Sequence, residues 1–213
     1  MDSELPSRSV TLAFPHSWQA EVLSARQLIA PARSFTYPRR IDEEAEAMAR
    51  GALEVLIRPA ACSAAGSADD SAGATPFLAT LALGFADPSA PSGLWSCPDP
   101  DQLCAVAGGY AYILNTLHPE QFTFLAFRPV LQVLPLVDRN LLLFAGHHAL
   151  LAWGPNGEAW QTARLSSEGL RITEIRGDDL HGFGWDLLTD REVPFGIDLR
   201  TGRRSGPQPE AAR

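Results

Sequence analysis

Three polar side chains that can take part in proton transfer recur at a fixed spacing. Glycines stand at positions 108, 146 and 184, 38 residues apart, and each is followed two residues later by Tyr110, His148 or Asp186. If the glycines mark equivalent points of a repeat, these side chains converge. A histidine titrates near neutral pH and a carboxylate can orient it, so the pattern predicts a ligand site or a general acid/base pair. Solvated turn residues are the alternative interpretation, and no residue is predicted to be catalytic.

The other polar clusters do not form a motif that binds a metal or a cofactor. His147 and His148 are neighbours, and neighbouring strand residues point to opposite faces, so they cannot both ligate one ion without a turn or bulge. The acidic run of Asp178, Asp179, Asp186, Asp190 and Glu192 lacks the spacing of a calcium-binding loop and is typical of a solvated loop. The sequence also lacks GxSxG, a P-loop and a strand-led GxGxxG. We therefore expect neither a cofactor nor a metal.

The elements that must position the three residues centre on Asn140 to Gly157. This stretch predicts an apolar strand, a Gly-His-His turn, a second apolar strand and a Pro-Asn-Gly turn. The flanking sequence restates it at the 38-residue spacing. A period of this size is typical of stacked supersecondary units, each burying a sheet face against the next.

The remaining segments also favour strands. Residues 77–85, 122–127, 130–137, 160–165, 170–175 and 195–199 predict strands, whereas 52–58 predicts a strand or a continuing helix. Pro135 indicates an edge strand or a bulge. Ser166 to Gly169 has the composition of a hairpin turn that would pair 160–165 with 170–175. Aromatic residues in this region are expected in the sheet core: Trp153, Trp160, Trp185, Phe183 and Phe195.

One N-terminal helix is expected near residues 42–50. Asp42 is a plausible N-cap, acidic residues occupy the first turn and Arg50 the last, which complements the helix dipole. Residues 60–75 are small and polar and predict a flexible insertion. The polar residues 205–213 predict a disordered tail. We expect a single mainly β domain over 1–213.

Two segments carry a resemblance to a known architecture. Residues 149–160, ALLAWGPNGEAW, combine an apolar strand, a Gly turn and a Trp that opens the next strand. Residues 195–202, FGIDLRTG, repeat the strand and the Thr-Gly turn. Over residues 101–202 the chain resembles the meander repeats of quinoprotein-like β-propellers. Gly154 stands where those repeats have an acidic residue, and about three units are too few to close a ring. The resemblance implies antiparallel meander sheets in a propeller-like fold or an open propeller fragment, with a curved stack of sheets or an unusual sandwich as the alternatives.

Composition limits the partners. Hydrophobic residues make up 46% and charged residues 20%, a globular balance. The net charge of −8 argues against nucleic acid or an anionic membrane as a partner. The N-terminus has no apolar signal segment and no apolar run is long enough to span a membrane, so we expect a cytoplasmic protein of bacterial type. Cys62, Cys97 and Cys104 are expected as reduced thiols, with a Cys97–Cys104 disulfide as the alternative.

These features predict a non-catalytic propeller-like binding or protein-interaction module. Its partner would be a protein, or a second copy joined through open sheet edges. The alternative function is a small-molecule-binding protein or hydrolytic enzyme with Tyr110, His148 and Asp186 in its cleft. An interaction module should expose an aromatic patch without a deep pocket. An enzyme should hold the His/Asp pair in a concave pocket with a shifted pKa.

Overall fold

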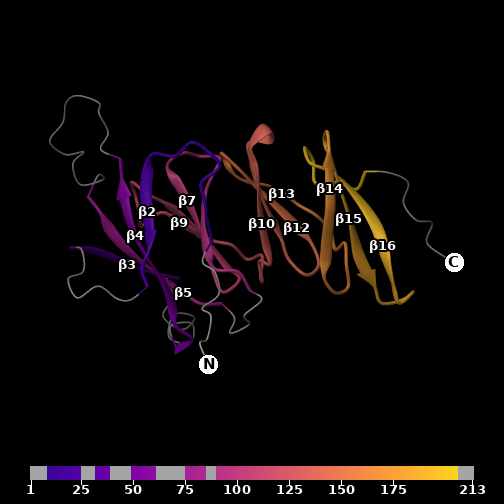
Figure 1. Cartoon of the computed structure of the whole chain (residues 1–213), viewed down its shortest axis with the longest axis horizontal. Helices are drawn as coiled ribbons and strands as arrows, with labels where there is room; N and C mark the ends of the chain where they lie inside the picture. Colours follow the sequence, from indigo (N-terminus) through magenta and orange to yellow (C-terminus); the bar gives the residue numbers. More distant parts are fainter. Residues whose placement is uncertain (1–8, 25–31, 39–48, 61–74, 85–89, 206–213) are drawn as a thin grey trace. The chain divides into compact units, whose positions relative to one another are not determined.

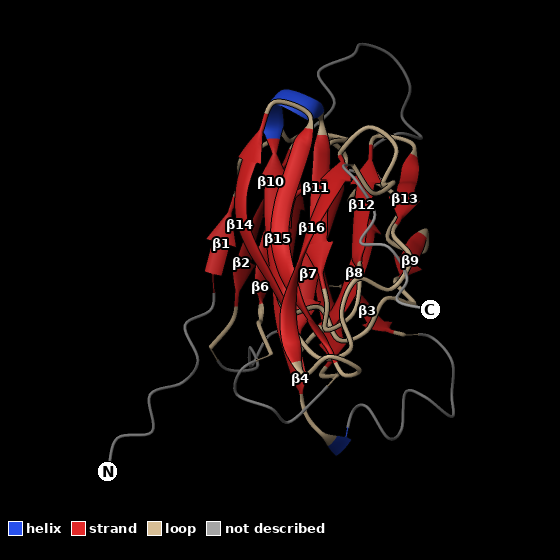
Figure 2. Ribbon diagram, turned by 90° about the vertical axis from the view of Figure 1, so that its right-hand side faces the viewer, coloured by secondary structure: helices blue, strands red, loops and turns tan. Residues whose placement is uncertain are grey.

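A computed structural model describes residues 9–24, 32–38, 49–60, 75–84 and 90–205 (Figure 1). Strands dominate these residues, so the predicted mainly β fold class is confirmed (Figure 2). The predicted helix near 42–50 lies outside the described residues except at 49 and 50. The predicted insertion 60–75 and tail 205–213 likewise lie outside them, apart from their terminal residues.

The chain divides into two compact units, Met1–Val130 and Leu131–Arg213. Compactness does not decide whether the two fold independently, so the single domain expected from the sequence stays a prediction.

The first unit contains two sheets. Its strands are β1 (Ser9–Thr11), β2 (Trp18–Val22), β3 (Arg33–Tyr37), β4 (Ala52–Pro59), β5 (Phe77–Ala82), β6 (Gly93–Ser96), β7 (Gln102–Ala107), β8 (Tyr110–Asn115) and β9 (Phe122–Phe124). Their orders are β2-β4-β5-β3 and β1-β6-β7-β8-β9. The ambiguous segment 52–58 is therefore a strand. Two pairs, β1 with β6 and β3 with β5, are parallel, which the sequence pattern did not indicate.

Both sheets of the first unit contribute to one hydrophobic core. Ile57 and Phe77 come from one sheet, and Leu103 and Tyr112 from the other, and all four are fully buried. The Tyr112 hydroxyl donates to the carbonyl of Ala82 at 2.8 Å, which satisfies a polar group inside this core.

The second unit consists of two meanders. Its elements are β10 (Gln132–Leu136), the 3-10 helix η2 (Val137–Arg139), β11 (Leu141–Ala145), β12 (Leu150–Gly154), β13 (Gly157–Gln161), β14 (Leu170–Arg176), β15 (Asp179–Asp186) and β16 (Arg191–Asp198). The sheets β10-β11-β12-β13 and β14-β15-β16 pair consecutive strands in antiparallel fashion, which confirms the predicted antiparallel meanders. Pro135 lies in the edge strand β10, as expected.

The starts of three strands can be compared with the 38-residue repeat, which stays a prediction. β7, β11 and β15 begin at residues 102, 141 and 179, offsets of 39 and 38 residues. Gly108 and Gly146 lie in the turns that follow β7 and β11, whereas Gly184 lies inside β15. A Cβ at Gly184 would stand 2.6 Å from the carbonyl oxygen of Leu165. Gly184 therefore allows the Leu165 backbone to approach β15 closely, and it does not form a turn.

The predicted hairpin across Ser166–Gly169 is wrong. β13 and β14 belong to different sheets, so this segment connects two sheets. The physical reason is the side chain of Ser166, which is buried and accepts hydrogen bonds from the backbone N–H groups of Trp185 and Glu168 at 2.8 and 3.1 Å. These bonds tie the segment to the end of β15.

Trp160 joins the two segments that carry the propeller resemblance. Its indole Nε1 donates to the carbonyl of Leu199 at 2.8 Å. Gly202 has a φ of +67°, and a Cβ there would lie 2.6 Å from the indole. Trp160, Trp153 and Phe195 are buried as predicted, whereas Phe183 and Trp185 are only partly buried.

Candidate functional site

Tyr110 belongs to the first unit and forms part of an aromatic and cationic cluster. Its ring packs edge-on against Phe124 with centroids 5.2 Å apart. The guanidinium carbons of Arg128 and Arg50 lie 5.2 and 5.9 Å from the Tyr110 ring centroid. Gly84 makes room for this arrangement, since a Cβ there would overlap the tyrosine ring. Sequence reasoning missed both arginines because each stands alone in the sequence.

His148 belongs to the second unit and lies in the exposed turn between β11 and β12. Its Nδ1 is 3.1 Å from the carbonyl oxygen of Ser166. A carbonyl oxygen can only accept, so this contact assigns the proton to Nδ1. The bond fixes the imidazole beside the connection that Ser166 ties to β15.

Asp186 ends β15 and caps its own turn. Its Oδ2 accepts from the Thr189 hydroxyl at 2.7 Å and its Oδ1 from the Leu188 N–H at 3.2 Å. The hydrogen bond from Thr189, followed by that from Leu188, lowers the pKa of this carboxyl group below its ordinary value. The carboxylate is therefore committed to local structure.

The three predicted residues are thus distributed over both units. Tyr110 lies in the first, and His148 and Asp186 lie in the second. Among the described residues of the second unit, His148 and Asp186 are bonded to different partners, Ser166 and the Leu188–Thr189 turn. A cleft formed by all three stays a prediction.

The turn that Asp186 caps presents two leucines to solvent. We call Asp186–Asp190 the leucine tip, because Leu187 is 64% and Leu188 96% exposed. Asp190 has a φ of +54°, the left-handed conformation that an aspartate tolerates in a turn. The Leu187 N–H lies 3.5 Å from the Ser167 hydroxyl, which adds a contact at the base of the tip.

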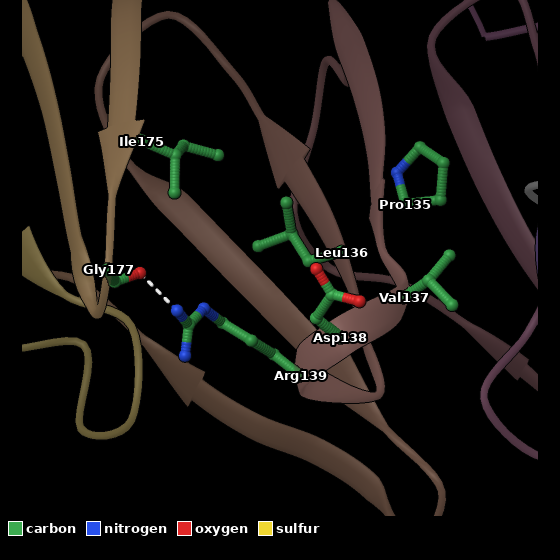
Figure 3. Close-up of a pocket in the computed structure, with 7 residues that line it drawn as sticks. All are labelled: Pro135, Leu136, Val137, Asp138, Arg139, Ile175 and Gly177. Atoms are coloured by element: carbon green, nitrogen blue, oxygen red, sulfur yellow. Dashed lines mark hydrogen bonds between the residues drawn. The ribbon is translucent and has the colours of Figure 1, made fainter.

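A groove of about 550 Å³ lies beside η2 in the second unit (Figure 3). Its lining comprises Pro135, Leu136, Val137, Asp138, Arg139, Ile175 and Gly177. The Arg139 guanidinium donates to the carbonyl of Gly177 and to the carboxylate of Asp178. Because Arg139 is already paired within the protein, the Asp138 carboxylate is the other charged group among the lining residues.

A second groove, of about 440 Å³, lies at the β2 and β4 ends in the first unit. It is lined in part by His16, Trp18 and Arg58. The His16 Nδ1 lies 3.0 Å from the Phe14 carbonyl oxygen, and its ring contacts Trp18 at 4.8 Å between centroids. Arg58 faces Glu21 at 3.7 Å, so a carboxylate neutralises the guanidinium at this groove.

Cys97 and Cys104 are free and buried, as favoured from the sequence over a cross-turn disulfide. Burial raises the pKa of both thiols well above the ordinary value, which keeps them protonated and poorly nucleophilic. Searching the described residues reveals no group of three or more His, Cys, Asp or Glu side chains arranged to hold a metal ion. Those residues also contain no helix of the length and apolarity needed to cross a membrane.

No protein-family model matches the chain, and a search of curated proteins finds no match. Similar solved structures include the N-terminal domain of Nup159, at 11% identity and a TM-score of 0.38, covering 94% of this chain and 53% of that chain. A chain of an S. cerevisiae complex of Dbp5 with Nup159, Gle1, IP6 and ADP matches at 11% identity and a TM-score of 0.38, covering 92% and 52%. The chain spans about half the length of these matches. A likeness of this size assigns neither fold nor function.

Proposed function

We propose that the chain is a non-catalytic, propeller-like protein-interaction module that binds its partner through the leucine tip. The observation that carries the proposal is the exposure of Leu187 and Leu188 side by side, at 64% and 96%, on a turn held by its own hydrogen bonds. Adjacent exposed apolar side chains are a feature of protein-binding surfaces. A turn that is already ordered loses little conformational entropy on binding.

Folding does not account for the two leucines. The turn is built by Asp186, Thr189 and Asp190, which supply the side-chain bonds and the positive φ. Hairpin turns favour Gly, Asn, Asp and Ser at such positions, and an exposed leucine adds no core contact. The leucines are therefore best explained by contact with another molecule.

Two observations support the propeller-like part of the proposal. Successive meanders begin their second strands about 38 residues apart, a spacing suited to stacked sheets. Within the second unit, Trp160 packs on the Gly202 turn that follows β16. This contact joins the two sheets through the same segments that resemble propeller repeats.

Self-association through a sheet edge is less well supported at β16. Ser205 N–H donates to the carbonyl of Gly196, and Asp198 N–H donates to the carbonyl of Arg203, both at 2.8 Å. These bonds show that the even-numbered residues of β16 direct their backbone groups outward. Pro194 is one of these residues, so this edge lacks an N–H donor at position 194. The missing donor weakens pairing with another strand.

The proposed location is the cytoplasm. Cys97 and Cys104 are reduced and buried in the structure, and this state suits a reducing compartment. The partner is proposed to be a protein, because the net charge of −8 disfavours nucleic acid and anionic membranes.

Site-specific photo-crosslinking tests the proposal. A benzophenone amino acid is placed at Leu188 and, as a matched control, at Glu158, an exposed position of the same unit. Irradiation in the cells that make the protein should give a discrete protein adduct from position 188 and none from 158. Excess wild-type chain should compete for the adduct, and a Leu187→Ser/Leu188→Ser chain should not. Identical adducts from both positions, or competition by the serine variant, would refute the role of the tip.

A further inference from the structure

The groove beside η2 lies where two sheets of the second unit end. β10 is the last strand of the sheet β10-β11-β12-β13, and β14 is the last strand of the sheet β14-β15-β16. Residues of β10, η2 and β14, together with Gly177, line this groove of about 550 Å³ (Figure 3). We call it the η2 groove. Because neither edge pairs with a further strand in the described part of the chain, a segment of another molecule can reach it without displacing an element.

Two exposed apolar side chains lie on the η2 groove. Val137 of η2 is 50% exposed and Ile175 of β14 is 40% exposed. They come from elements that do not pair with each other, and neither belongs to the hydrophobic core of this unit. Folding gains little from side chains that stay in water. Contact with an apolar group of a partner would remove both surfaces from solvent.

The charge that is available on the groove is negative. The Asp138 carboxylate lines the groove, is exposed and forms no ion pair or hydrogen bond with any residue that the structure describes. Arg139 is bound to the carbonyl of Gly177 and to the carboxylate of Asp178. The groove therefore favours a cation, and the net charge of −8 attracts a basic partner at longer range.

The backbone of Ile175 is also open to a partner. The odd-numbered residues of β16 direct their backbone groups toward β15, and one of them, Ile197, pairs with Leu180. Leu180 therefore faces β16, so Ile175, its neighbour on β14, turns its N–H and C=O away from β15. Neither group bonds to another described residue. The bulge between Ile172 and Glu174 interrupts this edge, which limits a paired segment to a short stretch.

We propose that the η2 groove binds a short extended segment of a partner protein that carries a lysine or arginine close to an apolar residue. The basic side chain pairs with Asp138, and the apolar side chain contacts Val137 and Ile175. The main chain of the segment bonds to the N–H and C=O of Ile175, as in the addition of a strand to a sheet edge.

The η2 groove is separate from the leucine tip, and its occupation does not depend on the tip. The groove adjoins Gly177, just before β15, whereas the tip begins at Asp186, where β15 ends. The eight residues of this strand place about 25 Å between the two sites.

Phage display of random short linear peptides tests the proposal. The target is the full-length chain carrying Leu187→Ser and Leu188→Ser, so that the leucine tip cannot select peptides. Enriched sequences should place lysine or arginine close to valine, isoleucine or leucine. Adding Asp138→Asn to the target should remove the preference for basic residues. Glu158→Gln, a matched change at an exposed carboxylate of β13, should leave that preference intact.

Titration of one enriched peptide with capped ends measures the contribution of each group. Asp138→Asn should weaken binding roughly twofold to fivefold, the effect of losing one exposed ion pair. Val137→Thr and Ile175→Thr keep the branched shape but remove an apolar group, and each should weaken binding roughly threefold. Glu158→Gln should leave the affinity unchanged. Unchanged melting temperatures in these variants exclude unfolding as the cause.

Two further probes separate a peptide from a small cation. N-methylation of single peptide bonds should abolish binding at one position, because it removes the donor to the Ile175 carbonyl. n-Butylammonium, which offers only a charged head and an apolar stem, should bind much more weakly than the peptide. Binding of n-butylammonium as tight as that of the peptide, or an N-methyl series without effect, would overturn the assignment to a peptide.

The selection itself can also overturn the proposal. It fails if no peptide is enriched, if the enriched peptides lack basic residues, or if the Asp138→Asn and Glu158→Gln targets select the same sequences. Each of these results is independent of the crosslinking experiment at Leu188, because the selection target lacks both leucines of the tip.

Discussion

The sheet β1-β6-β7-β8-β9 and the sheet β14-β15-β16 use their strands differently. β7 and β8 are buried along most of their length, whereas β15 alternates buried and partly exposed residues and β14 is mainly exposed. A strand buried on both faces is fixed by packing. A strand with one solvent-exposed face has fewer packing contacts and relies on hydrogen bonds to neighbouring segments. Ser166 and Trp160 form such bonds in the second unit.

The contrast indicates where changes are tolerated. In the first of these sheets, most side chains are occupied by the core. In the second, the polar bonds at the strand ends hold the turns, and the outward side chains are free to vary. The leucine tip belongs to the sheet β14-β15-β16, so its outward side chains can serve binding without destabilising the fold.

The largest expected difference comes from the same substitution made in both sheets. Leu103→Ala, at a fully buried position of β7, should lower the free energy of unfolding by about 2–5 kcal/mol, because it removes core contacts and leaves a cavity. Leu188→Ala, at a 96% exposed position, should change it by less than about 0.5 kcal/mol. Urea denaturation followed by circular dichroism measures both. Equal destabilisation would show that the tip packs against the protein.

Much of this architecture follows from the sequence pattern. The apolar stretches LLLFA and LLAWG, flanked by glycine turns, predict the β11–β12 pair, and the structure confirms it. Pro135 predicts an edge strand, because proline has no backbone N–H to donate to a neighbouring strand. These successes rest on local chemistry, which a sequence displays directly.

The failures concern contacts between distant residues. The Ser166–Gly169 segment has turn composition, yet Ser166 uses its hydroxyl to hold β15 and no hairpin forms. Gly184 fits the repeat register, yet its function is to let the Leu165 carbonyl approach. Arg50 and Arg128, 78 positions apart in the sequence, both lie near the Tyr110 ring, so no window of sequence reveals these contacts.

Gly184→Ala should have the next largest effect and tests how the second sheet is attached. The new Cβ would lie 2.6 Å from the Leu165 oxygen and 2.9 Å from the Ser166 Cβ. Relieving that overlap requires backbone movement, which should lower the free energy of unfolding by about 1–3 kcal/mol. In Gly154→Ala the nearest atom is 3.7 Å away, an ordinary contact, so the change should stay below about 1 kcal/mol.

The midpoint of urea unfolding compares these two glycine variants. A hydrogen-exchange measurement on the Trp185 amide adds the local view, because this N–H donates to Ser166 Oγ at 2.8 Å. Faster exchange in Gly184→Ala, but not in Gly154→Ala, is expected. If both variants behave alike, the close approach of Leu165 to Gly184 does not determine how the sheet β14-β15-β16 is held to the preceding segment.

The smallest expected effect is an acid-induced loosening of the leucine tip. Hydrogen bonds from Thr189 and Leu188 lower the pKa of Asp186 in the folded chain, so folding favours its charged form. A carboxylate whose pKa is depressed on folding stabilises the protein above the unfolded pKa, about 4 for aspartate. That contribution disappears as the pH falls through the lower folded pKa. The tip should therefore stay ordered at neutral pH and loosen in the acidic range.

Carboxyl NMR titration of Asp186 measures this directly, with the Leu188 amide as a second reporter. The carboxyl group should titrate below the ordinary aspartate value, and the Leu188 amide should shift with the same midpoint because its N–H donates to Oδ1. Thr189→Val removes the hydroxyl donor that has the largest influence on this pKa, so the midpoint should rise toward the ordinary value. An unchanged midpoint would show that the turn is not held by this carboxylate. The rigid display of Leu187 and Leu188 would then lose its physical basis, and with it the distinction between a preordered tip and an ordinary exposed loop.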